Sequence, residues 1–171
     1  MKILLAVGQS NNDTNRHDAA YVANQGVSYT GYDVQIWNPF AGAWQTLADA
    51  AGYNDPTWPG STPRPFFTAA AAVSLACRIS QENSEQVRVI CPNWPGAPIA
   101  NWVPATASNY VSDKAMVEAA LTEAGAAAVD VVTFLQGESD WTRPASAYRS
   151  DHENWQAQLR AETWCEAETP F

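Results

Sequence analysis

The chain of 171 residues suits a single domain covering residues 1–171, and with 46% hydrophobic and 16% charged residues it can form a packed core, which argues against intrinsic disorder. It carries 9 Lys and Arg against 18 Asp and Glu, which gives a formal net charge of -9. This acidic balance argues against a nucleic-acid partner, which requires a basic surface, and against binding to an anionic membrane.

The N-terminal segment MKILLAVGQS begins with a short apolar run after Lys2. Gly8 and Gln9 end this run too early for the hydrophobic region of a signal peptide. No stretch of the chain approaches the ~18 apolar residues of a membrane span. We therefore expect a strand at the N-terminus, no membrane partner and no export by a standard signal peptide, and the compartment stays open.

The first half of the chain predicts two strands, a long loop and a helix. Residues 2–7 (KILLAV) form a continuous apolar run, typical of a strand that is buried on both faces. Residues 33–37 (DVQIW) predict a short second strand. The proline-rich residues 38–65 predict a long irregular loop, and the alanine-rich residues 66–80 predict a buried helix.

The second half predicts two more strands, two helices and two loops. The strands are residues 86–91 (QVRVIC) and 129–135 (VDVVTFL), and the loops that follow them are residues 92–104 and 136–144. One helix is expected to run from Ser112, as its N-terminal cap, to Gly125, and the last helix to cover residues 145–162.

This alternation of strands and helices predicts an α/β fold with a parallel sheet and helices on both faces. Binding sites in such sheets lie beyond the carboxyl ends of the strands. Three predicted loops leave those ends, at residues 8–13, 92–104 and 136–144. The three cysteines, Cys77, Cys91 and Cys165, match no metal or redox spacing, and no structural disulfide is expected.

Each of the three loops carries a polar motif that has an ordinary structural explanation as well. Gly8-Gln9-Ser10-Asn11 can expose the Ser10 hydroxyl at the top of the sheet, or can be a simple turn. The segment 95–102 (PGAPIANW) can present a free N–H at its glycine, or can be a turn with a packed tryptophan. Residues 135–140 (LQGESD) can form a polar site, or can cap a helix through Ser139 or Asp140.

Together, and in this order along the chain, the motifs resemble the sialate O-acetylesterase-like and acetylxylan esterase branch of the SGNH hydrolases. The resemblance implies a three-layer α/β/α sandwich (SGNH/flavodoxin-like) and removal of acetyl groups from sugars such as sialic acid or xylan, without metal or cofactor. It makes Ser10 the nucleophile, places Gly96 and Gln136 in the oxyanion hole, and gives Glu138 a supporting role. An acetylated carbohydrate is then the expected partner, with Asn11, Trp102 and Trp141 as substrate contacts, because aromatic faces can stack on sugar rings.

The chain departs from this pattern in its general base. The family takes its histidine from an Asp-x-x-His motif near the C-terminus, which this sequence lacks. Of the two histidines, His17 is expected in a polar loop and His152 on the solvent-facing side of the last helix, so neither is a persuasive base. We favour a truncated chain, with an exposed sheet edge through which it could oligomerise. The alternatives are a site completed by a second polypeptide, a non-catalytic glycan-binding module, and a structural component of a larger assembly such as a phage particle.

Overall fold

The computed structural model describes residues 1–8, 31–39, 41–46, 70–92, 94 and 96–171. They form an α/β fold around a five-stranded sheet with the strand order β3-β2-β4-β1-β5. The strands are β1 (Lys2–Gly8), β2 (Val34–Asn38), β3 (Ala43–Thr46), β4 (Val87–Ile90) and β5 (Val131–Leu135). All neighbouring strands run parallel except β2 and β3, which pair antiparallel at one edge.

Strand β1 lies in the middle of the parallel part of the sheet, between β4 and β5. Residues 3–8 of this strand are all buried, as its uninterrupted apolar sequence predicts. Its last residue, Gly8, pairs with Leu135, the last residue of β5. The carboxyl ends of β1 and β5 therefore finish level with each other, which brings the segments that follow them to the same edge of the sheet.

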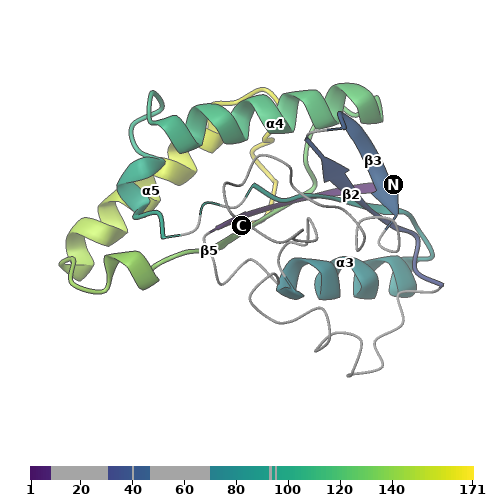
Figure 1. Ribbon diagram of the computed structural model, residues 1–171, viewed down its shortest axis with the longest axis horizontal. Coiled ribbons are helices and arrows are strands. Elements are labelled where there is room, and N and C mark those ends of the chain that lie inside the picture. Colours follow the sequence, from purple (N-terminus) through teal and green to yellow (C-terminus); the bar gives the residue numbers. More distant parts are fainter. Residues whose placement is uncertain (9–30, 40, 47–69, 93, 95) are drawn as a thin grey trace, which may run out of the picture.

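The helices cover both faces of the sheet. They are α3 (Ala70–Asn83), α4 (Ser108–Ala124) and α5 (Ala145–Arg160). Figure 1 shows α4 and α5 on one face and α3 on the other, which gives the three layers that the sequence predicts. A hydrophobic core lies on each side of the sheet, the larger one beneath α4 and α5 around Trp102, Trp155 and Trp164.

The sequence predicts most elements but misses two features. Strand β3 falls within the predicted loop 38–65, because its short sequence AWQT shows no apolar run and is recognisable only by its antiparallel pairing with β2. Helix α4 begins at Ser108 and not at Ser112, because Ala107 precedes it without a side-chain cap and leaves no sequence signal. The predicted end is confirmed, since Gly125 caps α4 in the left-handed conformation at φ 63°.

Strand β5 forms one edge of the sheet, where an exposed strand edge is expected from the sequence. This edge is partly covered, because residues 164–170 run beside it. The backbone N–H of Val132 donates to the Pro170 carbonyl at 2.9 Å, and Val129 N–H donates to the Trp164 carbonyl at 2.9 Å. Leu135 at the end of β5 remains 42% exposed.

Two further sequence expectations can be compared with the described part of the chain. All three cysteines are buried and none of them forms a disulfide within the described ranges, in line with their spacing. None of the helices found in the described ranges has the length and apolar character needed to cross a bilayer.

Candidate functional site

The last residue of β1, the segment after β4 and the segment after β5 meet at the carboxyl edge of the sheet, and they define the candidate site. The backbone N–H of Trp94, in the segment after β4, donates to the carbonyl of Gly8 at 3.0 Å. Gln136 follows the β5 residue that pairs with Gly8. The predicted nucleophile Ser10 comes two residues after Gly8 and lies outside the described residues, as do Asn11 and His17.

Gln136 joins the segment after β5 to the segment after β4. Its side-chain amide Nε2 donates to the Ala97 carbonyl at 3.1 Å and to Asp140 Oδ2 at 2.5 Å. Both amide protons therefore have acceptors, so Gln136 could donate to an oxyanion only after giving up one of these bonds. Its buried Oε1 has no hydrogen-bond partner among the residues that the structure describes. In this geometry Gln136 holds the neighbouring segment in place, which differs from the direct role that the resemblance implies.

Asp140 is the second link between these segments, a role that its sequence position as a candidate helix cap does not reveal. It is 8% exposed and lies at the end of the short 3-10 helix η4 (Glu138–Asp140). Its Oδ2 accepts the backbone N–H of Ile99 at 2.8 Å in addition to the Gln136 amide. Arg143 stands 4.0 Å from the other carboxylate oxygen. One buried carboxylate therefore fixes residues on both sides of the candidate site.

Replacing Asp140 with Ala is expected to lower the free energy of unfolding by about 2–4 kcal/mol, because two buried donors lose their acceptor. Asp140→Asn should cost less, since one amide oxygen can still accept from both Ile99 and Gln136. Thr142→Ala, an exposed neighbour, serves as the control. Urea denaturation of the variants measures the difference, and equal stability of Asp140→Ala and the parent chain would contradict the assignment.

Two glycines give the site its local backbone geometry. Gly96 has φ +72° in the turn closed by Ala97 N–H and the Trp94 carbonyl at 3.1 Å. No residue of the described ranges accepts a hydrogen bond from the Gly96 N–H, and Gly96 is exposed. Gly137 has φ +144°, a conformation that L-residues rarely adopt, beside the Tyr148 hydroxyl. Within the described ranges the Gly96 N–H is thus without an acceptor, and its oxyanion role stays a prediction.

The two tryptophans predicted to contact substrate have opposite environments. Trp102 is 0% exposed, and its indole N–H donates to Asp113 Oδ2 at 2.7 Å. Its burial excludes the stacking on a sugar that the sequence analysis expects, and Trp102 instead packs edge-on against Phe134. Trp141 is 83% exposed directly after the buried Asp140. Trp141 therefore keeps its predicted capacity to stack on a ring.

His152 is not the solvent-facing residue that the sequence predicts. It is half-buried, and its ring lies near those of Phe134, Tyr148 and Trp155 at centroid distances of 5.4, 6.4 and 5.7 Å. Burial lowers the pKa of His152 below its ordinary value, which favours the neutral ring that a general base needs. Among the described residues, no carboxylate forms an ion pair with this ring, unlike the acid that orients a histidine in a catalytic triad.

Tyr148 connects this aromatic group to the candidate site. Its hydroxyl donates to the Gln136 carbonyl at 2.9 Å. Burial raises the pKa of Tyr148, and the nearby Asp140 and Glu138 carboxylates act in the same direction, so the hydroxyl stays protonated as a donor. Glu138 itself is exposed in η4, and its supporting role stays a prediction.

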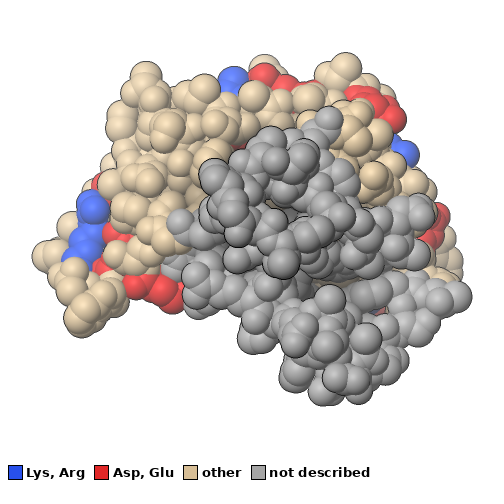
Figure 2. Space-filling view, in the orientation of Figure 1, with Lys and Arg blue, Asp and Glu red and all other residues tan. Residues whose placement is uncertain are grey.

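The charges around the site give no sign of a metal centre. Within the described ranges, no three His, Cys, Asp or Glu side chains lie close enough together to hold a metal ion. On the face shown in Figure 2, the described Lys and Arg side chains lie in small separate groups at the rim, with acidic side chains nearby. The polar groups at the site are thus mainly amides, backbone N–H groups and the buried Asp140.

Comparison with known proteins adds evidence on the fold. No protein-family model matches this chain, and no curated protein matches it in sequence. A protein from Arabidopsis thaliana with an X-ray structure is similar in fold, with a TM-score of 0.64 and 14% sequence identity. The match covers 93% of this chain and 68% of the Arabidopsis chain. At this identity the similarity shows a shared α/β fold and carries no activity across.

Proposed function

We propose that this protein is a serine esterase that removes acetyl groups from carbohydrates. The observation that carries the proposal is the meeting of Gly8, the 94–102 segment and Gln136 at one edge of the sheet. Gly8 begins the serine motif, and Gly96 and Gln136 belong to the other two motifs, so their meeting supports a site at the edge where α/β sheets bind ligands. The order and sequence of these three motifs, which resemble those of SGNH carbohydrate esterases, support the same chemistry.

In the proposed reaction the Ser10 hydroxyl oxygen attacks the carbonyl carbon of the acetyl group, and its proton passes to a general base. The carbonyl oxygen becomes an oxyanion that accepts from the Gly96 N–H and the backbone N–H of Ser10. The sugar hydroxyl then leaves with a proton, and acetyl-Ser10 remains. Water attacks this ester, releases acetate and restores the serine. Gln136 and Asp140 serve the reaction by fixing the segment that carries Gly96.

Covalent labelling of the full chain tests the nucleophile directly. A fluorophosphonate reacts with activated serines, and trypsin releases residues 3–16, in which Ser10 is the single serine. We expect one added label on this peptide, together with acetate release from p-nitrophenyl acetate or an acetylated sugar. Hydrolysis without a label on Ser10 would reject Ser10 as the nucleophile, and absence of both would reject the esterase.

Trp141→Ala is expected to weaken binding of an acetylated oligosaccharide by roughly 2- to 10-fold, because the ring loses a stacking contact of ~0.5–1.5 kcal/mol. Trp141 can make this contact because its ring is exposed beside the site. Trp141→Phe keeps an aromatic face and should retain most of the affinity. Calorimetric titration measures both variants, and equal affinity of Trp141→Ala and the parent chain would remove Trp141 from the proposed binding surface.

A non-catalytic glycan-binding module is the second candidate function. The exposed Trp141 and the occupied amide protons of Gln136 favour it, since they support binding without completing an oxyanion hole. This alternative predicts sugar binding that is lost in Trp141→Ala, no acetate release, and no labelling of Ser10. The labelling and binding experiments together therefore separate the two functions.

A further inference from the structure

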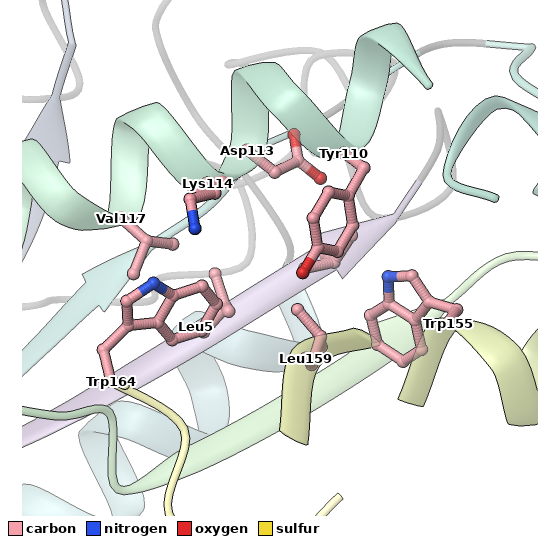
Figure 3. A pocket seen from close by; sticks show the side chains of 9 residues that line it. Leu5, Tyr110, Asp113, Lys114, Val117, Trp155, Leu159 and Trp164 are labelled. Atoms are coloured by element: carbon pink, nitrogen blue, oxygen red, sulfur yellow. The ribbon is translucent and has the colours of Figure 1, made fainter. Parts of the chain in front are cut away.

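Asp113 occupies an unusual position for a carboxylate. It is 7% exposed and lies on the buried side of α4, one turn from the buried residues Tyr110 and Val117. Figure 3 shows it next to Tyr110, beside a small cavity between α4, β1 and α5. A carboxylate in such apolar surroundings is unfavourable unless both of its oxygens accept hydrogen bonds.

Both oxygens of Asp113 are satisfied by tryptophans from the segment after β4. Trp94 Nε1 donates to Oδ1 at 2.6 Å, and Trp102 Nε1 donates to Oδ2 at 2.7 Å. These are short bonds of the kind that a charged acceptor strengthens. Burial raises the pKa of Asp113 to about 7, and the two indole bonds oppose this rise because they favour the carboxylate.

The two tryptophans stand on either side of the turn that carries Gly96. On one side, the Trp94 backbone N–H bonds to the carbonyl of Gly8 at the end of β1. On the other side, the buried Trp102 holds the end of the short 3-10 helix η3 (Ile99–Asn101), and its carbonyl accepts from Gln158 in α5 at 2.9 Å. Asp113 therefore joins both flanks of this turn to α4 through one carboxylate.

We propose that Asp113 is a positioning residue that fixes the Gly96 N–H beside the carboxyl end of β1 by holding Trp94 and Trp102. The proposal rests on the proposed function in one respect, since it takes the Gly96 N–H as the oxyanion donor. Asp113 itself touches no reacting atom. It acts on the same segment as Asp140, but from α4 and through indole N–H groups in place of the Ile99 backbone.

Asp113→Asn tests the positioning role, because the amide can accept from one indole but places its own N–H groups against the other. Nuclear magnetic resonance reports this without any activity. Among the eight tryptophans, the indole N–H signals of Trp94 and Trp102 are assigned from Trp94→Phe and Trp102→Phe. Spectra are recorded at pH 8, where the carboxylate is ionised. We expect Asp113→Asn to shift at least one of these indole signals and the backbone amide signal of Gly96.

Kinetics with p-nitrophenyl acetate provide the second measurement. We expect Asp113→Asn and Trp94→Phe to lower kcat about 10- to 100-fold with little change in KM, because a displaced oxyanion donor acts in the transition state. Glu118→Gln, on the exposed side of the same helix, is the matched control and should leave kcat unchanged. If Asp113→Asn fails to fold, Trp94→Phe alone is compared with the parent chain, because it removes only one indole N–H.

The outcomes separate this proposal from the proposed function. An unshifted Gly96 amide in Asp113→Asn overturns the positioning role, whether or not the chain is active. Unchanged kcat in a folded Asp113→Asn of an active enzyme also overturns it. If the parent chain hydrolyses no acetyl ester, the esterase proposal fails, and the shift of the Gly96 amide alone decides whether Asp113 holds this turn.

Discussion

Replacing Ser10 with Ala is expected to lower kcat for acetyl-ester hydrolysis by a factor on the order of 10³ or more, because the variant cannot form the acyl-enzyme. The Gly96 N–H and the rest of the site would remain, so the residual rate should reflect oxyanion stabilisation and binding alone. Release of p-nitrophenol and of acetate from an acetylated sugar measures the loss. Binding of the sugar should persist in the variant, since the exposed Trp141 ring is unchanged.

Ser150→Ala is the matched control for this substitution, because Ser150 is an exposed residue of α5. It should keep full activity and stability, as Ala is a good helix former. If Ser10→Ala keeps more than a tenth of the parent activity, another group performs the attack. The proposed mechanism would then be wrong even if the protein is an esterase.

The base for Ser10 can be identified by the same assay. The chain has two histidines, His17 and His152, and burial lowers the pKa of His152 below its ordinary value. Loss of activity in His152→Ala, with the pH profile of the parent chain set by a pKa below ~6.5, would assign the base to α5. Full activity of both histidine variants would exclude both histidines as the base and assign the proton transfer to another group of the active chain.

The sequence predicts the central sheet well because its strands carry their own signals. Strand β1 is a continuous apolar run, as burial on both faces of a parallel sheet requires, and β4 and β5 are rich in valine and other strand-forming residues. Their order along the chain, separated by helices, then places three polar motifs at one edge. This is why the sequence predicts the meeting of Gly8, the segment after β4 and Gln136.

The supporting residues of the site could not be predicted in the same way. Asp113 resembles any other polar residue of a helix until Trp94 and Trp102 are known to converge on it from 19 and 11 residues away. Asp140 resembles a helix cap, yet it accepts from Ile99, 41 residues away. The sequence predicts a solvent-facing His152 for a related reason, since the burial of this ring depends on Phe134 in β5. Tertiary contacts of this kind leave no pattern in a single local stretch of sequence.

Trp155→Ala is expected to be the most destabilising of the substitutions considered, with a loss of about 3–5 kcal/mol in the free energy of unfolding. Trp155 is 1% exposed and stacks on Phe134 with ring centroids 4.1 Å apart, while Phe171 meets it edge-on at 5.9 Å. Trp155 also lines a small internal cavity of about 10 Å³. Removing the indole would enlarge this cavity, and the surrounding core of α4, α5 and the sheet can close it only in part.

The same substitution at Trp141 provides the control, because this ring is 83% exposed and its loss should change stability by no more than about 0.5 kcal/mol. Trp155→Phe should fall between the two, since a smaller ring can still face Phe134. Urea denaturation measures the free energy of unfolding of the three variants and so gives the order of their stabilities. A stable domain has roughly 5–15 kcal/mol in all, so Trp155→Ala should leave the chain close to unfolding at 25 °C. Equal stability of Trp155→Ala and Trp141→Ala would mean that α5 does not pack on the sheet through Trp155. Because His152 and Tyr148 also lie on α5, their position beside the candidate site would then be contradicted as well.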